Sequence, residues 1–379
     1  MFMNILCVSH YFPPHLGGLE LVALSQSTRL VNAGHSVTVV TSKVRSDENN
    51  EAQNGVRIIR VHAANFLEKY GVPFPFFFPQ IVGALKREIR NADVVHLHDC
   101  QYLSSFMAAL IAKRLRKPIV LMQHVAMVTH PSRIVMAAQN LIFRTIGVYV
   151  TKASAKIITL NDRVADFMRS LGASEAALVA LANGVDSVTF HPVDFETKLA
   201  LRRSFGIATD KKIILFVGRF VPKKGFDVLL QARSERYQIV FCGGDAPKEA
   251  RNEPDVHFLG EVRHGEMHKV YQCADMFVLP STDEGFPLSI QEAMATGLPV
   301  ITTDDPGYRR YRLDAQRFTL LTQPNPDLIR CTITMLLEDE TKLTEMSIYS
   351  CQYAAAQFSW EQITQKLIAT YRAAIGAAK

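Results

Sequence analysis

The sequence of 379 residues contains only six cysteines, and no two of them form a C-x-x-C pair. They are Cys7, Cys100, Cys242, Cys273, Cys331 and Cys351. Such spacing argues against a zinc site or a disulfide framework and is typical of a reducing cytoplasm. We therefore expect a cytoplasmic protein whose cysteines are small buried hydrophobic residues.

Segments typical of membrane insertion or secretion are also lacking. The uncharged stretches Tyr70–Leu85 and Pro118–Ser132 are shorter than the roughly 18 apolar residues that a helix needs to cross a bilayer. Met1–Ser9 has neither the basic start nor the small-residue cleavage site of a signal peptide, and its pattern favours a strand. Internal repeats and low-complexity segments are absent as well. These absences predict an ordinary globular protein without a membrane span.

Charge is modest in amount but uneven in distribution. The formal net charge is +6, and residues 81–160 alone contain 11 basic against 3 acidic residues. This segment has no recognisable nucleic-acid-binding motif, so we expect no nucleic-acid partner. Its basic residues accompany apolar helical patterns, which fits contact with an anionic membrane surface. An ordinary solvated surface is the alternative.

Short apolar runs alternate with helical patterns along the chain, which predicts parallel α/β sheets. The first set of expected strands is Asn4–Ser9, Ser36–Thr41, Val56–Val61, Asp93–Leu97, Ile119–Gln123 and Lys156–Leu160. The second set is Lys212–Val217, Tyr237–Cys242, Val256–Leu259, Met276–Leu279 and Pro299–Thr302. The two sets predict two doubly wound domains, with ligands beyond the carboxyl ends of the strands.

The expected domains are residues 1–187 and 188–356. A closing helix over about 357–379 carries Trp360, Ile363, Leu367 and Tyr371 on one face. This stripe predicts that the helix packs against a core, and we expect that core to be the first domain's.

The strongest chemical signal is a pair of carboxylates, Glu284 and Glu292. The first is expected in a loop after a strand and the second about one turn inside the next helix. Between them, the backbone N–H groups of residues 285–288 would face an anion at the helix N-terminus. A carboxylate can accept two hydrogen bonds from a sugar diol. A nucleotide-sugar offers both a diphosphate and several diols.

A second signal follows the strand Lys212–Val217. Gly218-Arg219 ends this strand, and Lys223-Lys224-Gly225 precedes the next helix. Arg219 and Lys224 could converge on a diphosphate, one as a forked donor and the other as a point charge. The alternative is a solvated turn with surface cations.

Four motifs occur in order along the chain: Gly17-Gly18-Leu19-Glu20, Asn183-Gly184-Val185-Asp186, Gly218-Arg219 with Lys224-Gly225, and Glu284 with Glu292-Ala293. Taken together they resemble the retaining family-4 glycosyltransferases, also described as glycosyl transferases group 1. The resemblance extends over nearly the whole chain. It implies the GT-B fold, in which two Rossmann-like domains face each other across a cleft. The first domain would bind the acceptor and the second the nucleotide-sugar.

The resemblance implies catalytic roles for four residues, Glu284, His124, Arg219 and Lys224. Glu284 would contact the transferred sugar. Arg219 and Lys224 would bind the diphosphate and stabilise the charge that develops on it. His124 matches the family histidine that approaches the donor sugar from the first domain.

Further residues would bind the substrates. The donor-binding set is Gly17, Gly18, Gly218, Gly285, Phe286, Pro287, Leu288 and Glu292. Gly17 and Gly18 would form the loop under the donor phosphate, and Glu292 would hold the ribose hydroxyls. The acceptor-side candidates are Glu20, His98 and Asn183.

The resemblance also implies how the sugar is transferred. The family is thought to retain anomeric configuration by front-face attack, with the leaving phosphate accepting the proton of the acceptor. No protein nucleophile and no cofactor are then expected. Since Arg219 and Lys224 supply positive charge, no metal is expected either. His96-Leu97-His98 could ligate a metal at a strand end, but similar strands line the cleft in the resembled family.

One segment departs from the family pattern. After the strand Pro299–Thr302, the family usually has a glycine pair followed by an acidic residue, whereas this chain has Asp304-Asp305-Pro306-Gly307 and continues to Tyr311. The loop is expected near the donor. It therefore leaves the base and the sugar of the donor open.

The acceptor is expected on the first domain. The aromatic run Val72–Pro79 and the basic segment 81–160 suggest a surface that meets lipid headgroups. We expect a hexosyl- or N-acetylhexosaminyl-transferase, peripheral on the inner membrane face, that extends a lipid-linked glycan in cell-surface polysaccharide or lipopolysaccharide biosynthesis. The alternatives are a soluble small-molecule acceptor, a nucleotide-sugar epimerase and an inactive nucleotide-sugar-binding protein.

Overall fold

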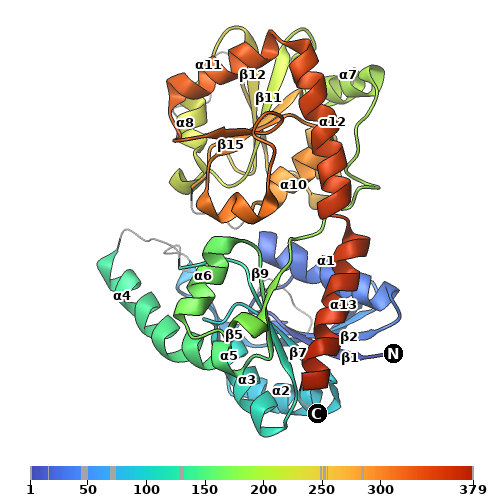
Figure 1. Ribbon diagram of the computed structural model, residues 1–379, viewed down its shortest axis with the longest axis vertical. Coiled ribbons are helices and arrows are strands. Elements are labelled where there is room, and N and C mark those ends of the chain that lie inside the picture. The colour runs from blue at the N-terminus through green and yellow to red at the C-terminus, as the bar shows by residue number, and fades with distance from the viewer. Residues whose placement is uncertain are drawn as a thin grey trace. The chain divides into compact units, whose positions relative to one another are not determined.

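The computed structural model describes residues 2–15, 17–43, 50–68, 74–127, 132–247, 250, 253, 255–282 and 286–377. The chain divides into two compact units (Figure 1). Unit 1 contains Met1–Asn183 and Glu361–Lys379, and unit 2 contains Gly184–Trp360. The boundaries expected from the sequence were after residues 187 and 356.

Among the described residues, unit 1 forms an eight-stranded sheet in the order β10-β9-β8-β7-β1-β2-β4-β3. The strands are β1 Asn4–Val8, β2 Ser36–Ser42, β3 Asn50–Gln53, β4 Val56–Val61, β7 Val94–His98, β8 Ile119–Gln123, β9 Lys156–Thr159 and β10 Leu178–Ala180. β3 pairs antiparallel with β4, and the other neighbours pair in parallel. β7 and β8 are buried along their whole length, as expected for parallel strands covered on both faces.

The helices of unit 1 cover this sheet. They are α1 Gly18–Asn32, α2 Gln80–Asn91, α3 Leu103–Arg114, α4 Arg133–Ile142, α5 Val148–Ala153 and α6 Asp162–Ser170, with most of α13 Trp360–Ala377. One hydrophobic core cluster joins residues of β1, β7 and β8 to the apolar faces of α2 and α3. In α13, the side chains of Trp360, Ile363, Leu367 and Tyr371 are buried. The predicted core-facing stripe is thus confirmed, and the helix belongs to unit 1 from Glu361 onward.

In the described part of unit 2, the strands form a six-stranded parallel sheet in the order β13-β12-β11-β14-β15-β16. The strands are β11 Lys212–Val217, β12 Tyr237–Cys242, β13 Val256–Gly260, β14 Met276–Leu279, β15 Val300–Thr303 and β16 Thr319–Leu321. Its helices include α7 Phe195–Ser204, α8 Phe226–Gln231, α9 Met267–Gln272, α10 Leu288–Ala295, α11 Pro326–Leu337 and α12 Glu340–Gln357. The predicted α/β class with two Rossmann-like sheets is therefore confirmed.

Strands β8, β11, β12 and β14 begin and end where the sequence predicted. The predictions missed β3, β10, β16 and the small pair β5 Ala63–Ala64 and β6 Phe76–Phe77. These strands have two to four residues and lie at sheet edges or outside the main sheets, so none forms an apolar run long enough to be recognised. The first residues of the aromatic run Val72–Pro79 lie outside the described part of the chain.

The sequence analysis expected no membrane span, and one helix bears on this expectation. α4, a π-helical turn at Phe143–Gly147 and α5 form a continuous helix of 21 residues, Arg133–Ala153. Among the described residues this helix is long and apolar enough to cross a membrane, by length and composition only. The sequence analysis excluded a membrane span by looking for long uncharged stretches. This helix escaped that search because Arg144 interrupts its uncharged stretch. Core helices of soluble proteins pass the same test.

The chain crosses between the units twice, and the two crossings are paired. The Val185 N–H donates to the Phe358 carbonyl at 2.7 Å, and Val185 forms a β-bridge with Ser359. Gly184 lies directly against the indole ring of Trp360, because a Cβ built on it would be 2.2 Å from a ring atom. Only a residue without a side chain fits at this contact.

Replacing Gly184 by alanine should therefore destabilise the protein by about 1–3 kcal/mol, since the new methyl group overlaps a buried ring. Gly83 is the matched control. It is exposed within α2, with no atom within 4 Å of a built Cβ, so Gly83→Ala should stabilise by about 0.5–1 kcal/mol. Denaturant unfolding of both variants measures the two effects, and equal stabilities would contradict the Gly184 contact.

Candidate active site

In unit 1, polar residues follow the strands at the carboxyl edge of the sheet, where ligands bind in open α/β sheets. His124 comes directly after β8, and two residues at the end of β7 hold it. Its backbone N–H donates to Asp99 Oδ1 at 2.8 Å, and its Nε2 is hydrogen-bonded to His98 Nδ1 at 2.9 Å. Asp99 has a φ of 60°, a left-handed conformation that is uncommon outside glycine. Two predicted site residues, His98 and His124, are thus in direct contact.

A third histidine of the same edge extends this contact. The rings of His96 and His98 stack with their centroids 4.5 Å apart. His96 Nδ1 is hydrogen-bonded to the Tyr371 hydroxyl at 2.5 Å, which connects the edge to α13. Groups of three or more histidine, cysteine or acidic side chains with metal-binding geometry are absent from the described residues.

Burial determines the charge of these groups. It lowers the pKa of His124 to about 4 and that of His96 to about 3, and it places the pKa of His98 well below its ordinary value. The three imidazoles are therefore neutral at pH 7. Burial also raises the pKa of Asp99 to about 7, although hydrogen bonds from His124 and Gln101 oppose the shift. This edge consequently offers hydrogen-bonding groups rather than full charges.

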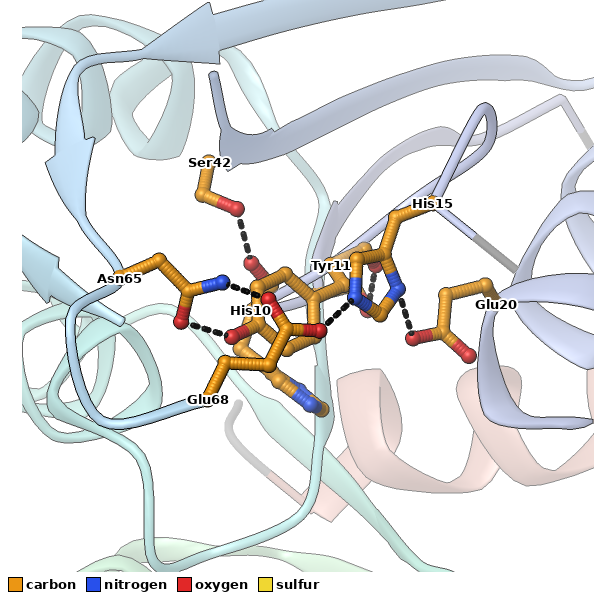
Figure 2. Close-up of polar contacts among 8 residues, drawn as sticks. His10, Tyr11, His15, Glu20, Ser42, Asn65 and Glu68 are labelled. Atoms are coloured by element: carbon orange, nitrogen blue, oxygen red, sulfur yellow. Dashed lines mark hydrogen bonds and ion pairs between the residues drawn. The ribbon is translucent and has the colours of Figure 1, made fainter. Parts of the chain in front are cut away.

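A second polar cluster surrounds the loop between β1 and α1 (Figure 2). Figure 2 shows His15 between two carboxylates: its Nδ1 lies 2.9 Å from Glu20 Oε1, and its Nε2 lies 2.9 Å from Glu68 Oε1. Tyr11 stacks on His15 with centroids 4.0 Å apart, and its hydroxyl donates to Asn65 Oδ1 at 2.5 Å. The amide of Asn65 donates in turn to Glu68. The contacts attach the loop at 65–68 to the β1–α1 loop.

The charge state of His15 differs from that of the three histidines above. Burial lowers its pKa, but hydrogen bonds to Glu20 and Glu68 outweigh burial and raise it above its ordinary value. Glu20, predicted on the acceptor side, is 5% exposed and its carboxylate faces His15. No local pattern predicts the Glu68 contact, because Glu68 is a loop residue 53 positions away from His15.

The predicted glycine loop lies beside this cluster. Gly17 has extended backbone at the start of α1, and a Cβ built on it would be 2.3 Å from a carboxylate oxygen of Glu20. Gly18 is exposed with open space around it. Asn183, the remaining acceptor-side candidate, is buried at the end of unit 1, and its Oδ1 has no hydrogen-bond partner among the described residues.

In unit 2, glycines allow three backbone segments to approach closely at the carboxyl edge. Gly243 follows β12 with a φ of 127°, and a Cβ on it would be 2.4 Å from the carbonyl oxygen of Gly218. Gly225 has a φ of 71°, and a Cβ on it would be 2.2 Å from the carbonyl oxygen of Pro280. Non-glycine residues are strained in these conformations and would collide with backbone. The turn that carries the predicted cations is therefore packed tightly against its neighbours.

The two predicted cations border this packed turn. Arg219 is exposed and Lys224 is partly buried. The Thr282 N–H donates to the carbonyl of Lys223 at 2.8 Å, so the turn is attached to the loop that follows β14. Glu284 and Gly285, the next predicted residues, lie outside the described part of the chain.

The remainder of that loop is strained and buried. Phe286 has a φ of 125°, which is costly for a residue with a side chain and is typical of functional sites. Its ring is 2% exposed and stacks on Tyr311 with centroids 4.2 Å apart. Pro287 is buried and Leu288 partly buried. The side chain of Phe286 packs in the interior, which leaves its backbone as the part able to meet a ligand.

Glu292, one turn inside α10, is buried with its carboxylate paired. The Tyr271 hydroxyl donates to Glu292 Oε2 at 2.7 Å, a contact that the sequence did not suggest. Burial raises the pKa of Glu292 to about 7, and the hydrogen bond from Tyr271 opposes this shift. The carboxyl group of Glu292 accepts one hydrogen bond from Tyr271. Its remaining lone pairs can accept hydrogen bonds from hydroxyl groups of a ligand.

Comparisons with known proteins show the family and the fold of the chain. Residues 16–188 match the family model described as Glycosyltransferase Family 4, and residues 197–352 match the model described as Glycosyl transferases group 1. D-inositol 3-phosphate glycosyltransferase of Corynebacterium diphtheriae is 26% identical, over 94% of this chain and 89% of that protein.

Two solved structures have similar folds. Anabaena HepE in complex with UDP and glucose has a TM-score of 0.76 at 17% identity, covering 97% of this chain and 99% of that one. WaaG, a glycosyltransferase involved in lipopolysaccharide biosynthesis, has a TM-score of 0.70 at 19% identity, covering 96% and 98%. At these identities the likeness shows the shared fold.

The buried carboxyl group of Glu292 makes stability depend on pH. Its pKa rises on folding from an ordinary value of 4.5 to about 7, so the native state binds more protons between these values and stability falls as pH rises through them. Glu292→Gln removes this dependence while still accepting from Tyr271. We expect the variant to exceed the wild type by up to about 3 kcal/mol at pH 8, with little gain at pH 4.5. Denaturant unfolding at both values tests this, and a gain independent of pH would contradict it.

Proposed function

The chain belongs to the family 4 glycosyltransferases of group 1 and has their GT-B fold, and we propose that it moves a sugar from a nucleotide-diphosphate donor to a hydroxyl group of a lipid-linked glycan. We propose further that the anomeric configuration is retained. The transferred sugar in this proposal is a hexose or an N-acetylhexosamine. The observation that carries the proposal is the carboxyl edge of the unit 2 sheet.

That edge combines the features that a nucleotide-sugar requires. Backbone segments approach one another closely at this edge, at Gly218, Gly225 and Gly243. The cations Arg219 and Lys224 border the same turn. Breaking a glycosyl–phosphate bond places negative charge on the leaving diphosphate, which preorganised cations stabilise. Glu292 supplies a carboxyl group for the ribose hydroxyls. HepE, which shares the fold, was solved with UDP and glucose, and this supports a donor of that chemical class.

The proposed roles in unit 1 follow from its neutral edge. His124 meets the donor sugar as a hydrogen-bonding group, since burial keeps its imidazole uncharged at pH 7. The leaving phosphate accepts the proton of the acceptor hydroxyl, so the proposal includes no protein nucleophile. It also includes no metal or other cofactor, because Arg219 and Lys224 provide the positive charge at the phosphate.

The lipid-linked acceptor is proposed from the surface of α4. This helix has no buried residue among those described, and Ile134 and Leu141 are 82% and 65% exposed. Arg133 and Arg144 belong to the same continuous helix, and Figure 1 shows this helix along one side of unit 1. A helix with exposed apolar residues and basic neighbours favours the interface of an anionic membrane. The enzyme would then be cytoplasmic and peripheral on the inner membrane face.

A soluble acceptor is the second candidate. The Corynebacterium relative is named for a small phosphorylated acceptor, D-inositol 3-phosphate. Its match spans nearly the whole of this chain, so the same reaction class with a soluble acceptor deserves a direct assay. Vesicle binding distinguishes a lipid-linked acceptor from a soluble one.

Donor binding provides the first test. A thermal-shift screen with UDP, GDP, ADP and CMP should identify one base by an increase in melting temperature. Arg219→Ala and Lys224→Ala should each weaken binding of that nucleotide diphosphate about 10- to 100-fold, because a charged hydrogen bond contributes about 1.5–3 kcal/mol. Lys212→Ala is the matched control, since Lys212 begins β11 at the opposite end from Gly218.

Turnover tests the sugar-side residue separately. Glu284→Ala should lower kcat about 100-fold or more, as expected for loss of a group that acts in the transition state. A loss confined to KM would place Glu284 outside the chemical step. Unchanged turnover and unchanged donor affinity in Glu284→Ala and Lys224→Ala together would overturn the assignment of the donor site.

Vesicle flotation tests the membrane part of the proposal. The wild type should float with vesicles that contain anionic lipid and not with neutral vesicles. Ile134→Glu and Leu141→Glu should each reduce the bound fraction several-fold, because a charged side chain then replaces the inserted apolar one. Met335→Glu, at a 65% exposed position of α11 in unit 2, is the matched control. Absence of flotation by the wild type would favour the soluble acceptor.

A further inference from the structure

The side chain of His98 is buried, and its one hydrogen bond among the described residues joins it to His124, the proposed substrate-contacting histidine. Its ring is 1% exposed, its Nδ1 lies 2.9 Å from Nε2 of His124, and its Nε2 has no partner among the described residues. We infer that His98 is a positioning residue that fixes the tautomer of His124, so that His124 carries its proton on Nδ1. The inference rests on the proposed function in taking His124 as the residue that meets substrate.

Two proton arrangements satisfy the bond between the rings. In the first, His98 Nδ1–H donates to His124 Nε2, and the unpartnered Nε2 of His98 is a bare lone pair. In the second, His124 Nε2–H donates to His98 Nδ1, and the unpartnered Nε2 of His98 is an N–H group. Among buried backbone groups, N–H donors without an acceptor are rarer than under-satisfied carbonyl acceptors, and we apply the same preference to the imidazole nitrogen. The first arrangement is therefore favoured, and it places the proton of His124 on Nδ1.

Neighbouring groups hold the backbone of His124 and cover one face of the His98 ring. The backbone N–H of His124 is held by Asp99 Oδ1 at 2.8 Å. The face of His98 is covered by His96 at a centroid distance of 4.5 Å, and His96 is itself bonded to the Tyr371 hydroxyl. Which nitrogen of a histidine carries the proton depends on the hydrogen bond made by the other nitrogen. Here that bond comes from His98.

Neither ring takes up a second proton at pH 7. The titratable groups around His98 are His96, His124 and His10, and a charge on any of them would disfavour a charge on His98. Burial lowers the pKa of each of these histidines, so all remain neutral at pH 7. A single proton lies between the two rings. His98 therefore determines which nitrogen of neutral His124 carries the proton, and it does not change the charge of His124.

As a consequence, each ring nitrogen of His124 has a fixed role as donor or acceptor. Its Nε2 is occupied as an acceptor, so Nδ1–H is the group left for substrate. His124 then donates a hydrogen bond to an oxygen of the donor sugar or phosphate and cannot act there as a base. This role agrees with a reaction in which the leaving phosphate takes the acceptor proton.

Nitrogen NMR of the histidine side chains tests the tautomer without any substrate. Protein labelled with ¹⁵N-histidine should show His124 and His98 both protonated on Nδ1 at pH 7, with His124→Asn and the His98 variants used to assign the signals. In His98→Asn the amide can donate from a similar place, so the Nδ1–H signal of His124 should persist. In His98→Leu that signal should be replaced by the Nε2–H tautomer or a mixture. A wild-type His124 protonated on Nε2, or one unaffected by His98→Leu, overturns the inference.

Kinetics then connects the tautomer to the reaction. His98→Leu should lower kcat about tenfold or more, corresponding to one hydrogen bond in the transition state, while His98→Asn should retain activity within about threefold. Equal loss in both variants, with an unchanged melting temperature, would show that the hydrogen bond is not the cause. If the NMR result holds but kcat is unchanged in His98→Leu, the positioning of His124 stands and its proposed contact with the donor sugar fails.

Discussion

Parallel pairing of buried strands is the constraint on which both units depend. Strands covered on two faces must be apolar along their length, and β8 and β14 are buried throughout. Polar residues therefore lie mainly at or after the ends of such strands, and His96, buried within β7 and hydrogen-bonded to the Tyr371 hydroxyl, is an exception. Because the strands run in the same direction, their carboxyl ends meet at one edge of the sheet. His98 and His124 in unit 1, and Gly218 and Gly243 in unit 2, are brought together in this way.

Burial at those edges gives the two units different electrostatic character. In unit 1 the histidines after β7 and β8 lose their charge, and the nearby Asp99 titrates near neutrality. In unit 2 burial raises the pKa of Glu292 to about 7, whereas the guanidinium group of Arg219 is exposed. Positive charge thus lies on the side proposed to hold the diphosphate. Neutral hydrogen-bonding groups lie on the side proposed to meet the sugar.

The sequence predicted the parts of the fold that depend on local pattern. β8, β11, β12 and β14 are continuous apolar runs flanked by polar residues, and their bounds were found without error. Contacts between distant segments were not predicted. The bonds of His15 to Glu68 and of Tyr271 to Glu292 join residues with no shared periodicity, and pairing of that kind follows from tertiary structure alone. The bond between His98 and His124 could be predicted in part. His98 ends β7 and His124 directly follows the neighbouring strand β8, so the sheet brings the two residues close together.

The loop that departs from the family pattern has a structural role in this chain. Residues Pro306–Tyr311 form a short 3₁₀ helix, and Tyr311 stacks on Phe286, which has strained backbone beside the proposed sugar-contacting Glu284. Tyr308 also contacts Phe286, edge to face at 5.0 Å. Strained backbone persists where surrounding packing holds it, and here two tyrosines of the departing loop provide that packing. The departing segment thus packs against Phe286, which belongs to the loop proposed to contact the donor sugar.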